Sequence, residues 1–154
     1  MTTANFLPRE DFARVVQCAP LVSVDLIITD AGNNFLVGLR ENEPAKGTYF
    51  VPGGVIRKGE TLDQAFERIL QAETGLTVKR TDARFLGVYE HFYQTNRFLD
   101  PSYGTHYVVL AYAIGFATRP EVRQDSQHSV FRWMSRADIT TSTDVHENTK
   151  AYMR

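Results

Sequence analysis

One strong helix pattern, with strand patterns on both sides of it, most constrains the fold of this 154-residue chain. Within residues 61–74, apolar side chains recur at the spacing of a single helix face. These side chains belong to Leu62, Ala65, Phe66, Ile69 and Leu70. Thr61 and Gln64 have capping-box spacing, and Gly75 suits a C-terminal stop. The pattern therefore predicts a helix from Thr61 to Thr74.

The next position on this apolar stripe holds Glu73. A carboxylate in line with a buried face is costly unless a cation or a metal ion stabilises it. Alternatively, the end of the helix is exposed and water solvates Glu73. The residue types alone leave both interpretations open.

Strand patterns before and after this helix predict an α+β domain. Alternating apolar residues span 21–29, the turn residues 30–34 follow, and a second strand resumes at 35–40, which together indicate a hairpin. We expect further strands at 49–51, 83–92, 105–116 and 130–133, a loop at 94–104, a short helix after Pro8 and a weaker helix near 144–152. The fold class expected is α+β, a mixed β-sheet packed between α-helices, in a single domain covering residues 1–154.

Composition excludes several classes of protein. Lys plus Arg total 17 and Asp plus Glu total 18, which argues against a broad nucleic-acid-binding face. The single cysteine, Cys18, cannot form an intrachain disulfide, and charges occupy the N-terminal region where a signal peptide needs an apolar core. The longest apolar run, Tyr107 to Ala117, is about half of a membrane span. We therefore expect a cytoplasmic protein with no membrane and no nucleic-acid partner.

A loop–helix motif has the spacing G-x5-E-x7-R-x4-E-x-G followed by an aliphatic residue. Its fixed positions are Gly54, Glu60, Arg68, Glu73 and Gly75. The motif resembles the Nudix box, G-x5-E-x7-R-E-U-x-E-E-x-G-U, which in that family binds magnesium and the diphosphate of a substituted nucleoside diphosphate. The resemblance implies a Nudix fold. Two carboxylates of the box are missing here, since Ile69 and Ala72 occupy their positions.

The same two losses occur in one Nudix subfamily, the GDP-mannose mannosyl hydrolases, which this chain resembles over nearly its whole length. The matching segments include Pro20–Asp25, Phe50–Gly54, Ala65–Arg68, Gly87–Tyr93, Thr105–Leu110 and Gln127–His128 before Arg132–Trp133. The resemblance implies Mg2+-dependent hydrolysis of GDP-mannose, and of GDP-glucose, to GDP and free hexose. Water would attack the anomeric carbon with inversion, Mn2+ would substitute for Mg2+, and the protein would be a homodimer. Two alternatives stay open: a conventional Nudix pyrophosphatase attacking phosphorus, and a non-catalytic nucleotide-sugar binding protein.

The resemblance also implies roles for individual residues. The backbone carbonyl of Gly53, the carboxylate of Glu73 and the amide oxygen of Gln127 would hold Mg2+, all being the oxygen donors that this ion prefers. His128 would be the general base, because an imidazole of pKa about 6.5 accepts a proton near neutral pH. Without the resemblance, Gln127 and His128 would be read as ordinary surface residues.

Arg40 would clamp the diphosphate, or else be a solvated strand end. Arg68 would orient Glu73 or a phosphate, or pair with Glu60 or Glu67. Asp25, His91 and Tyr107 match positions near the sugar and diphosphate, with sheet packing as the alternative. The guanine-binding segment would include Phe6, Leu7 and Phe12, for which core packing is the alternative.

One further departure concerns the phosphate site. Subfamily members can carry an arginine just after the second glycine, where this chain has Val55. Arg57 or Lys58, from the same loop, would replace it, or one phosphate contact is absent. The 94–104 loop is also longer than the subfamily pattern, which suggests an influence on sugar selectivity.

Overall fold

A mixed β-sheet forms the centre of the protein, seen in a computed structural model that describes residues 7–123 and 130–154. Its strands are β1 (Leu21–Thr29), β2 (Asn34–Leu39), β3 (Tyr49–Phe50), β4 (Gly53–Val55), β5 (Arg84–Tyr93), β6 (Thr105–Gly115) and β7 (Phe131–Ser135). The main strand order is β3-β2-β1-β6-β5, with β4 paired to β1 and β7 paired to β2. The expected α+β class with a mixed sheet is confirmed.

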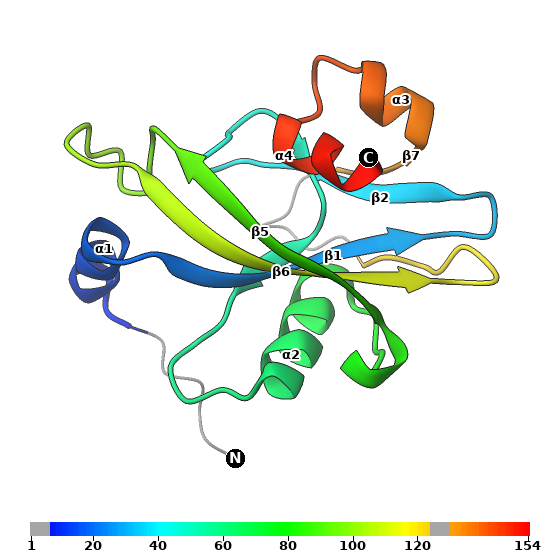
Figure 1. The fold of residues 1–154 in the computed structure, drawn as a ribbon, viewed down its shortest axis with the longest axis horizontal. Helices are drawn as coiled ribbons and strands as arrows, with labels where there is room; N and C mark the ends of the chain where they lie inside the picture. The colour runs from blue at the N-terminus through cyan, green and yellow to red at the C-terminus, as the bar shows by residue number, and fades with distance from the viewer. Residues whose placement is uncertain (1–6, 124–129) are drawn as a thin grey trace.

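β1 is the central strand and organises the rest of the sheet (Figure 1). It runs parallel to β6 along its whole length, from Leu21↔Tyr107 to Thr29↔Gly115. On its other edge it pairs antiparallel with β2 near Thr29 and with β4 near Asp25. The other strand pairs of the sheet are antiparallel.

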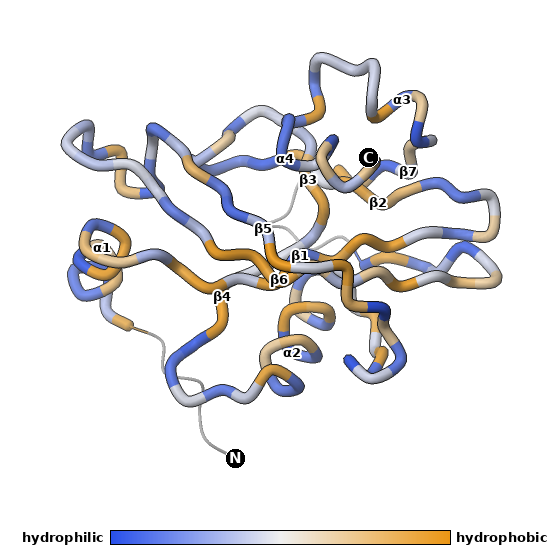
Figure 2. The backbone as a smooth tube through the Cα atoms, viewed as in Figure 1, coloured by the Kyte–Doolittle hydropathy of each residue, from blue (hydrophilic) through white to orange (hydrophobic). Residues whose placement is uncertain are grey.

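Helices cover the two faces of the sheet (Figure 1). They are α1 (Arg9–Cys18), α2 (Leu62–Thr74), α3 (Arg136–Thr141) and α4 (Glu147–Lys150), with 3-10 turns at Arg80–Asp82 and Ala151–Met153. α2 packs Ala65, Phe66, Ile69 and Leu70 against Val24, Leu26 and Ile28 of β1. The opposite face of β1, including Ile27, packs with Ile139, Val145, Tyr152 and Met153 of the C-terminal segment. Figure 2 shows hydrophobic stretches of β5 and β6 between these two layers.

The local signals for α2 are confirmed. Thr61 and Gln64 form the reciprocal capping box, and Gly75 closes the helix in the left-handed conformation with φ 76°. Within the described ranges, no helix is long and apolar enough to cross a membrane.

The structure differs from the sequence expectations at four points. Residues 53–55, expected only to stop a strand, form β4 because their backbone completes the edge of β1. α3 was not expected, and the helix predicted near 144–152 is the short α4 followed by a 3-10 turn. Val22, expected on the buried face of β1, is 44% exposed because it lies before the part of the strand that packs on α2.

Candidate active site

A cluster of polar and aromatic side chains lies on the face of the sheet opposite α2. Its members come from β1, the end of β2, β5, β6 and the C-terminal segment. They are Asp25, Arg40, His91, Tyr93, Tyr107, His146 and Tyr152. The structure therefore brings together four residues that the sequence singled out: Asp25, Arg40, His91 and Tyr107.

Asp25 is the buried carboxylate of this cluster. Its side chain accepts a hydrogen bond from the Tyr152 hydroxyl at 2.5 Å, and the Tyr152 ring packs against Tyr89 at 4.8 Å between centroids. Burial raises the pKa of Asp25 to about 6, although the Tyr152 hydrogen bond and the Arg40 charge act in the opposite direction. Asp25 thus titrates near neutral pH, as groups at functional sites often do.

His91 is the buried imidazole of the cluster. Burial lowers its pKa to about 4, and the nearby His146 adds to that effect, so the ring is neutral at pH 7. Within the described residues, its buried Nε2 has no hydrogen-bond partner. A neutral ring with an unmatched nitrogen can exchange a hydrogen bond with a ligand hydroxyl.

A pocket of about 150 Å³ opens beside the cluster, between α1 and the loops after β2 and β5. Phe12, Arg40 and Tyr107, all expected substrate-binding or catalytic residues, line it together. Arg40 is oriented there because its Nε donates to the Pro44 carbonyl at 2.8 Å. Burial raises the pKa of Tyr107, so its hydroxyl stays protonated at neutral pH. Leu7, which was expected with Phe12, is 39% exposed and does not line this pocket.

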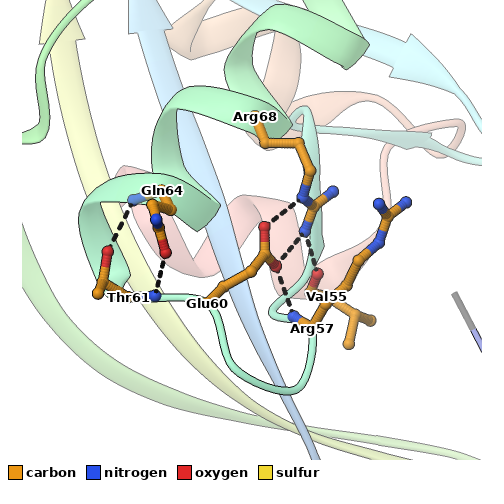
Figure 3. Close-up of polar contacts among 6 residues, drawn as sticks. All are labelled: Val55, Arg57, Glu60, Thr61, Gln64 and Arg68. Carbon is orange, nitrogen blue, oxygen red and sulfur yellow. Dashed lines mark hydrogen bonds and ion pairs between the residues drawn. The ribbon is translucent and has the colours of Figure 1, made fainter. Parts of the chain in front are cut away.

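Two Nudix-box residues, Glu60 and Arg68, pair with each other (Figure 3). Arg68 donates to Glu60 through Nε at 2.6 Å and through a terminal nitrogen at 2.9 Å, and also donates to the Val55 carbonyl at 2.8 Å. Glu60 also accepts the Arg57 amide at 2.7 Å. Arg68 and these hydrogen bonds hold the pKa of Glu60 below its usual range. Glu60 is thus one of the expected partners that Arg68 contacts. The pair holds the 55–60 loop against α2.

The backbone carbonyl of Gly53 points away from β1. Leu26 donates to the Pro52 carbonyl and Ile56 donates to the Val22 carbonyl, both at 2.8 Å. Because bonded and non-bonded pairs alternate in an antiparallel ladder, the carbonyl of Gly53 faces the same side as that of Val55. That side is the one reached by Arg68 of α2.

Glu73 lies on the same side of the helix as the residue that contacts β4. A Cβ on Gly54 would lie 3.2 Å from Ile69, and Glu73 is half-buried one helical turn beyond Ile69. Gly53 and Glu73 thus offer a carbonyl and a carboxylate, the oxygen donors that suit Mg2+. Within the described ranges there is no group of three His, Cys, Asp or Glu that could hold a metal. Gln127, His128 and Phe6 lie outside the described residues.

Gly53 is required for close approach of two strands rather than for an unusual backbone angle. A Cβ at this position would lie 2.5 Å from Asp25 Oδ1 and 2.7 Å from the Val24 carbonyl. We predict that Gly53→Ala destabilises the protein by about 1–3 kcal/mol and impairs activity, because β4 must move off β1. Urea unfolding measures the effect. Gly115→Ala is the matched control, since its Cβ would meet only Thr29 at 3.6 Å, and equal losses in the two variants would contradict the prediction.

Several residues of the site were missed by sequence reasoning. Tyr152, His146 and Asn148 come from the C-terminal segment, and Asn148 donates to the Tyr93 hydroxyl at 3.0 Å. The His146 ring lies 5.4 Å from the Tyr93 ring. No local pattern marks these residues, because their partners on β1 and β5 are distant in sequence.

This combination of fold, loop–helix motif and pocket defines a class of protein. The pattern of the NUDIX domain matches residues 19–154, and the chain belongs to the NUDIX family of hydrolases. It is 40% identical over 123 residues to the low-salt glycan biosynthesis protein Agl8 of Haloferax volcanii, covering 80% of this chain and 76% of that protein. It is also 43% identical over 70 residues to an ADP-ribose pyrophosphatase of Methanocaldococcus jannaschii, covering 46% of this chain and 40% of that one.

Solved structures share the fold. A MutT protein from Methanosarcina mazei Go1 superposes with a TM-score of 0.70 at 18% identity, covering 87% of this chain and 91% of that one. The NUDIX domain of Shewanella oneidensis NrtR, solved with ADP ribose, gives a TM-score of 0.67 at 18% identity, covering 96% and 95%. The expected Nudix fold is therefore confirmed.

Proposed function

We propose that this NUDIX hydrolase cleaves GDP-mannose, and GDP-glucose, to GDP and free hexose by attack of water on the anomeric carbon, with inversion. The carrying observation is the state of the Nudix box. Ile69 is 1% exposed in the hydrophobic core, and Ala72 is exposed on the helix surface. Glu60 is engaged by Arg68. Of the three carboxylates that the box pattern places at positions 69, 72 and 73, the chain keeps Glu73. α2 therefore lacks the carboxylate cluster that would also activate water against phosphorus.

Nudix hydrolases generally use divalent cations such as Mg2+. In this proposal the Gly53 carbonyl, Glu73 and Gln127 hold Mg2+, and Mn2+ substitutes for it. When bound there, the ion would supply positive charge to offset that of the diphosphate. The half-buried Glu73 and the outward-facing carbonyl of Gly53 support this assignment.

The residues of the chain then divide the remaining work. An imidazole nitrogen of His128 takes a proton from water as the water oxygen bonds to the anomeric carbon and the bond from that carbon to the diphosphate oxygen breaks. Arg40 and Tyr107, which line the pocket, bind the diphosphate. Asp25 and His91 bind the hexose hydroxyls. A diphosphate whose charge is offset in this way would be a competent leaving group, so the second carboxylate of ordinary glycosidases would not be required.

The guanine is assigned to the segment that contains Phe6, Leu7 and Phe12. Of Leu7 and Phe12, the two members that the structure describes, Phe12 lines the pocket, and an aromatic ring there can stack on a base. Arg68 acts by holding the 55–60 loop on α2. We further propose a cytoplasmic homodimer, with no nucleic-acid or membrane partner.

A second candidate is hydrolysis at phosphorus. It is favoured by the similarity of 46% of the chain to a protein named ADP-ribose pyrophosphatase. The Haloferax relative, named for glycan biosynthesis, covers more of the chain and fits a nucleotide-sugar substrate. Retention of Gln127 and His128 argues against a third reading, a binding protein without catalysis.

Product identification tests the proposal. The protein is incubated with GDP-, UDP- and ADP-sugars, with and without Mg2+, and the products are separated by chromatography. We expect GDP and free hexose from GDP-mannose, in a reaction that requires Mg2+. GMP and hexose phosphate would support attack at phosphorus, and tight binding without turnover would support the binding protein.

A further inference from the structure

We propose that Arg97, on the loop between β5 and β6, is a phosphate-binding residue that supplies the positive charge missing at position 55. The inference rests on the proposed function, because the ligand class is the diphosphate of a nucleotide or nucleotide sugar. Val55 and Arg97 line the same pocket, together with Arg40 and Tyr107.

The loop that carries Arg97 is well ordered by its own hydrogen bonds. Asn96, only 1% exposed, donates to the carbonyls of Asp100 and Tyr103, both at 2.7 Å. Its side-chain oxygen accepts the Phe98 amide at 3.0 Å. Thr105 of β6 also donates to the Thr95 carbonyl at 2.8 Å. The backbone position of Arg97 is therefore fixed on its N-terminal side by the buried Asn96.

The residue after Arg97 is anchored too. The ring of Phe98 meets Phe12 of α1 edge-on, with 5.7 Å between centroids, and the Arg9 guanidinium lies 4.9 Å from the centre of the Phe98 ring. Across the pocket, Thr95 donates to the Glu43 carboxylate at 2.8 Å and so ties this loop to the one after β2. Fixing both flanks of Arg97 reduces the conformational entropy lost when a ligand binds.

The charges around the pocket favour an anion. Arg40, Arg97 and Tyr107 line it together, and the two arginine charges act against the rise in the pKa of Tyr107 that burial causes. Glu43 is the carboxylate in the lining, and it already accepts the Thr95 hydroxyl. Two guanidinium groups and a phenol hydroxyl form a donor set suited to a diphosphate.

Arg57 and Lys58, the replacements expected from sequence, are less suited to this role. Both residues lie in the loop that precedes α2, and Lys58 is exposed. Neither lines the pocket that contains Val55. The compensating cation therefore comes from a segment about 40 residues further along the chain.

Calorimetric titration of the Mg2+-containing protein with GDP, inorganic pyrophosphate and guanosine tests Arg97. We expect Arg97→Gln to weaken GDP and pyrophosphate binding about tenfold, the loss of one charge-assisted contact, and to leave guanosine binding unchanged. Arg97→Lys keeps the charge but not the planar guanidinium. Its affinity for GDP and pyrophosphate should lie between those of the wild type and Arg97→Gln. The loss should shrink at high salt, because the contact is exposed.

Arg84→Gln, an exposed arginine at the far end of β5, is the matched control for loss of one positive charge and should bind like wild type. Wild-type affinity for GDP and pyrophosphate in Arg97→Gln would overturn the inference, as would a loss seen in Arg57→Gln instead. If the wild type binds ADP as well as GDP, the guanine preference of the proposed function fails while the role of Arg97 stands. A wild-type protein that binds no diphosphate would overturn both.

Discussion

Replacement of His128 by alanine is expected to lower kcat by about 10²- to 10⁴-fold, the usual contribution of a general base. Binding of Mg2+ should be nearly unchanged, because the metal is assigned to Gly53, Glu73 and Gln127. The acidic limb of the wild-type kcat profile should lose the component that reports protonation of the His128 imidazole. Steady-state kinetics against pH and calorimetric titration with Mg2+ provide the two measurements.

His106→Gln is the control for this experiment. The His106 ring stacks on Phe92 at 4.3 Å between centroids, and His106 is not a member of the polar and aromatic cluster that contains Asp25. Its loss should therefore leave the pH profile intact. Near-wild-type turnover in His128→Ala would contradict the assignment of the base. A loss of Mg2+ affinity as large as the loss of kcat would make His128 a metal ligand instead.

Replacement of Asp25 by asparagine is expected to stabilise the fold at neutral pH while impairing catalysis. Burial raises the folded pKa of Asp25 from 3.8 to about 6. Its contribution to stability is therefore fully present below the unfolded pKa and is lost as pH rises through the folded one. A pKa shift of that size lowers the free energy of unfolding by about 3 kcal/mol above pH 6. Asparagine stays neutral and can still accept the Tyr152 hydrogen bond, so it avoids the loss.

The measurement is urea unfolding of both proteins between pH 4 and pH 8 without Mg2+. The variant should match wild type at pH 4 and exceed it progressively up to about pH 6. The quantity to compare is the difference in unfolding free energy between the two proteins. His91, with a pKa lowered to about 4, makes both proteins more stable as pH rises over this window, and the difference removes that shared effect. A difference that does not change with pH would contradict the account of Asp25.

Asp30→Asn provides a control of opposite sign. Hydrogen bonds from Asn34, Gly32 and Arg119 lower the pKa of Asp30 to about 2. Its contribution is present above the unfolded pKa and is lost as pH falls through the folded one. This variant should therefore be less stable than wild type at neutral pH, and the difference should shrink in acid.

Sequence patterns predicted the elements whose signals are local. The α2 boundaries follow from apolar spacing, the Thr61 cap and Gly75, and most strands follow from alternation. β4 was missed because Gly53 and Gly54 resemble a turn, and only pairing with β1 makes them a strand. α3 and α4 are short, and tertiary packing rather than a long periodic pattern stabilises them.

The site was partly predictable for a related reason. Asp25, Arg40, His91 and Tyr107 were singled out through resemblance to a family, and the fold brings them together. Tyr152 escaped notice because its partner, Asp25, lies 127 residues away, and no pattern within either strand or helix encodes that contact. Arg97 escaped for the same reason, since its pocket also draws on α1 and the loop after β2.

The central claim is that water attacks carbon rather than phosphorus. Hydrolysis of GDP-mannose in oxygen-18 water, followed by mass spectrometry of both products, tests it most directly. The account predicts one labelled oxygen in the hexose and none in GDP. Release of GMP and hexose phosphate, with the label on a phosphate of either product, would contradict it.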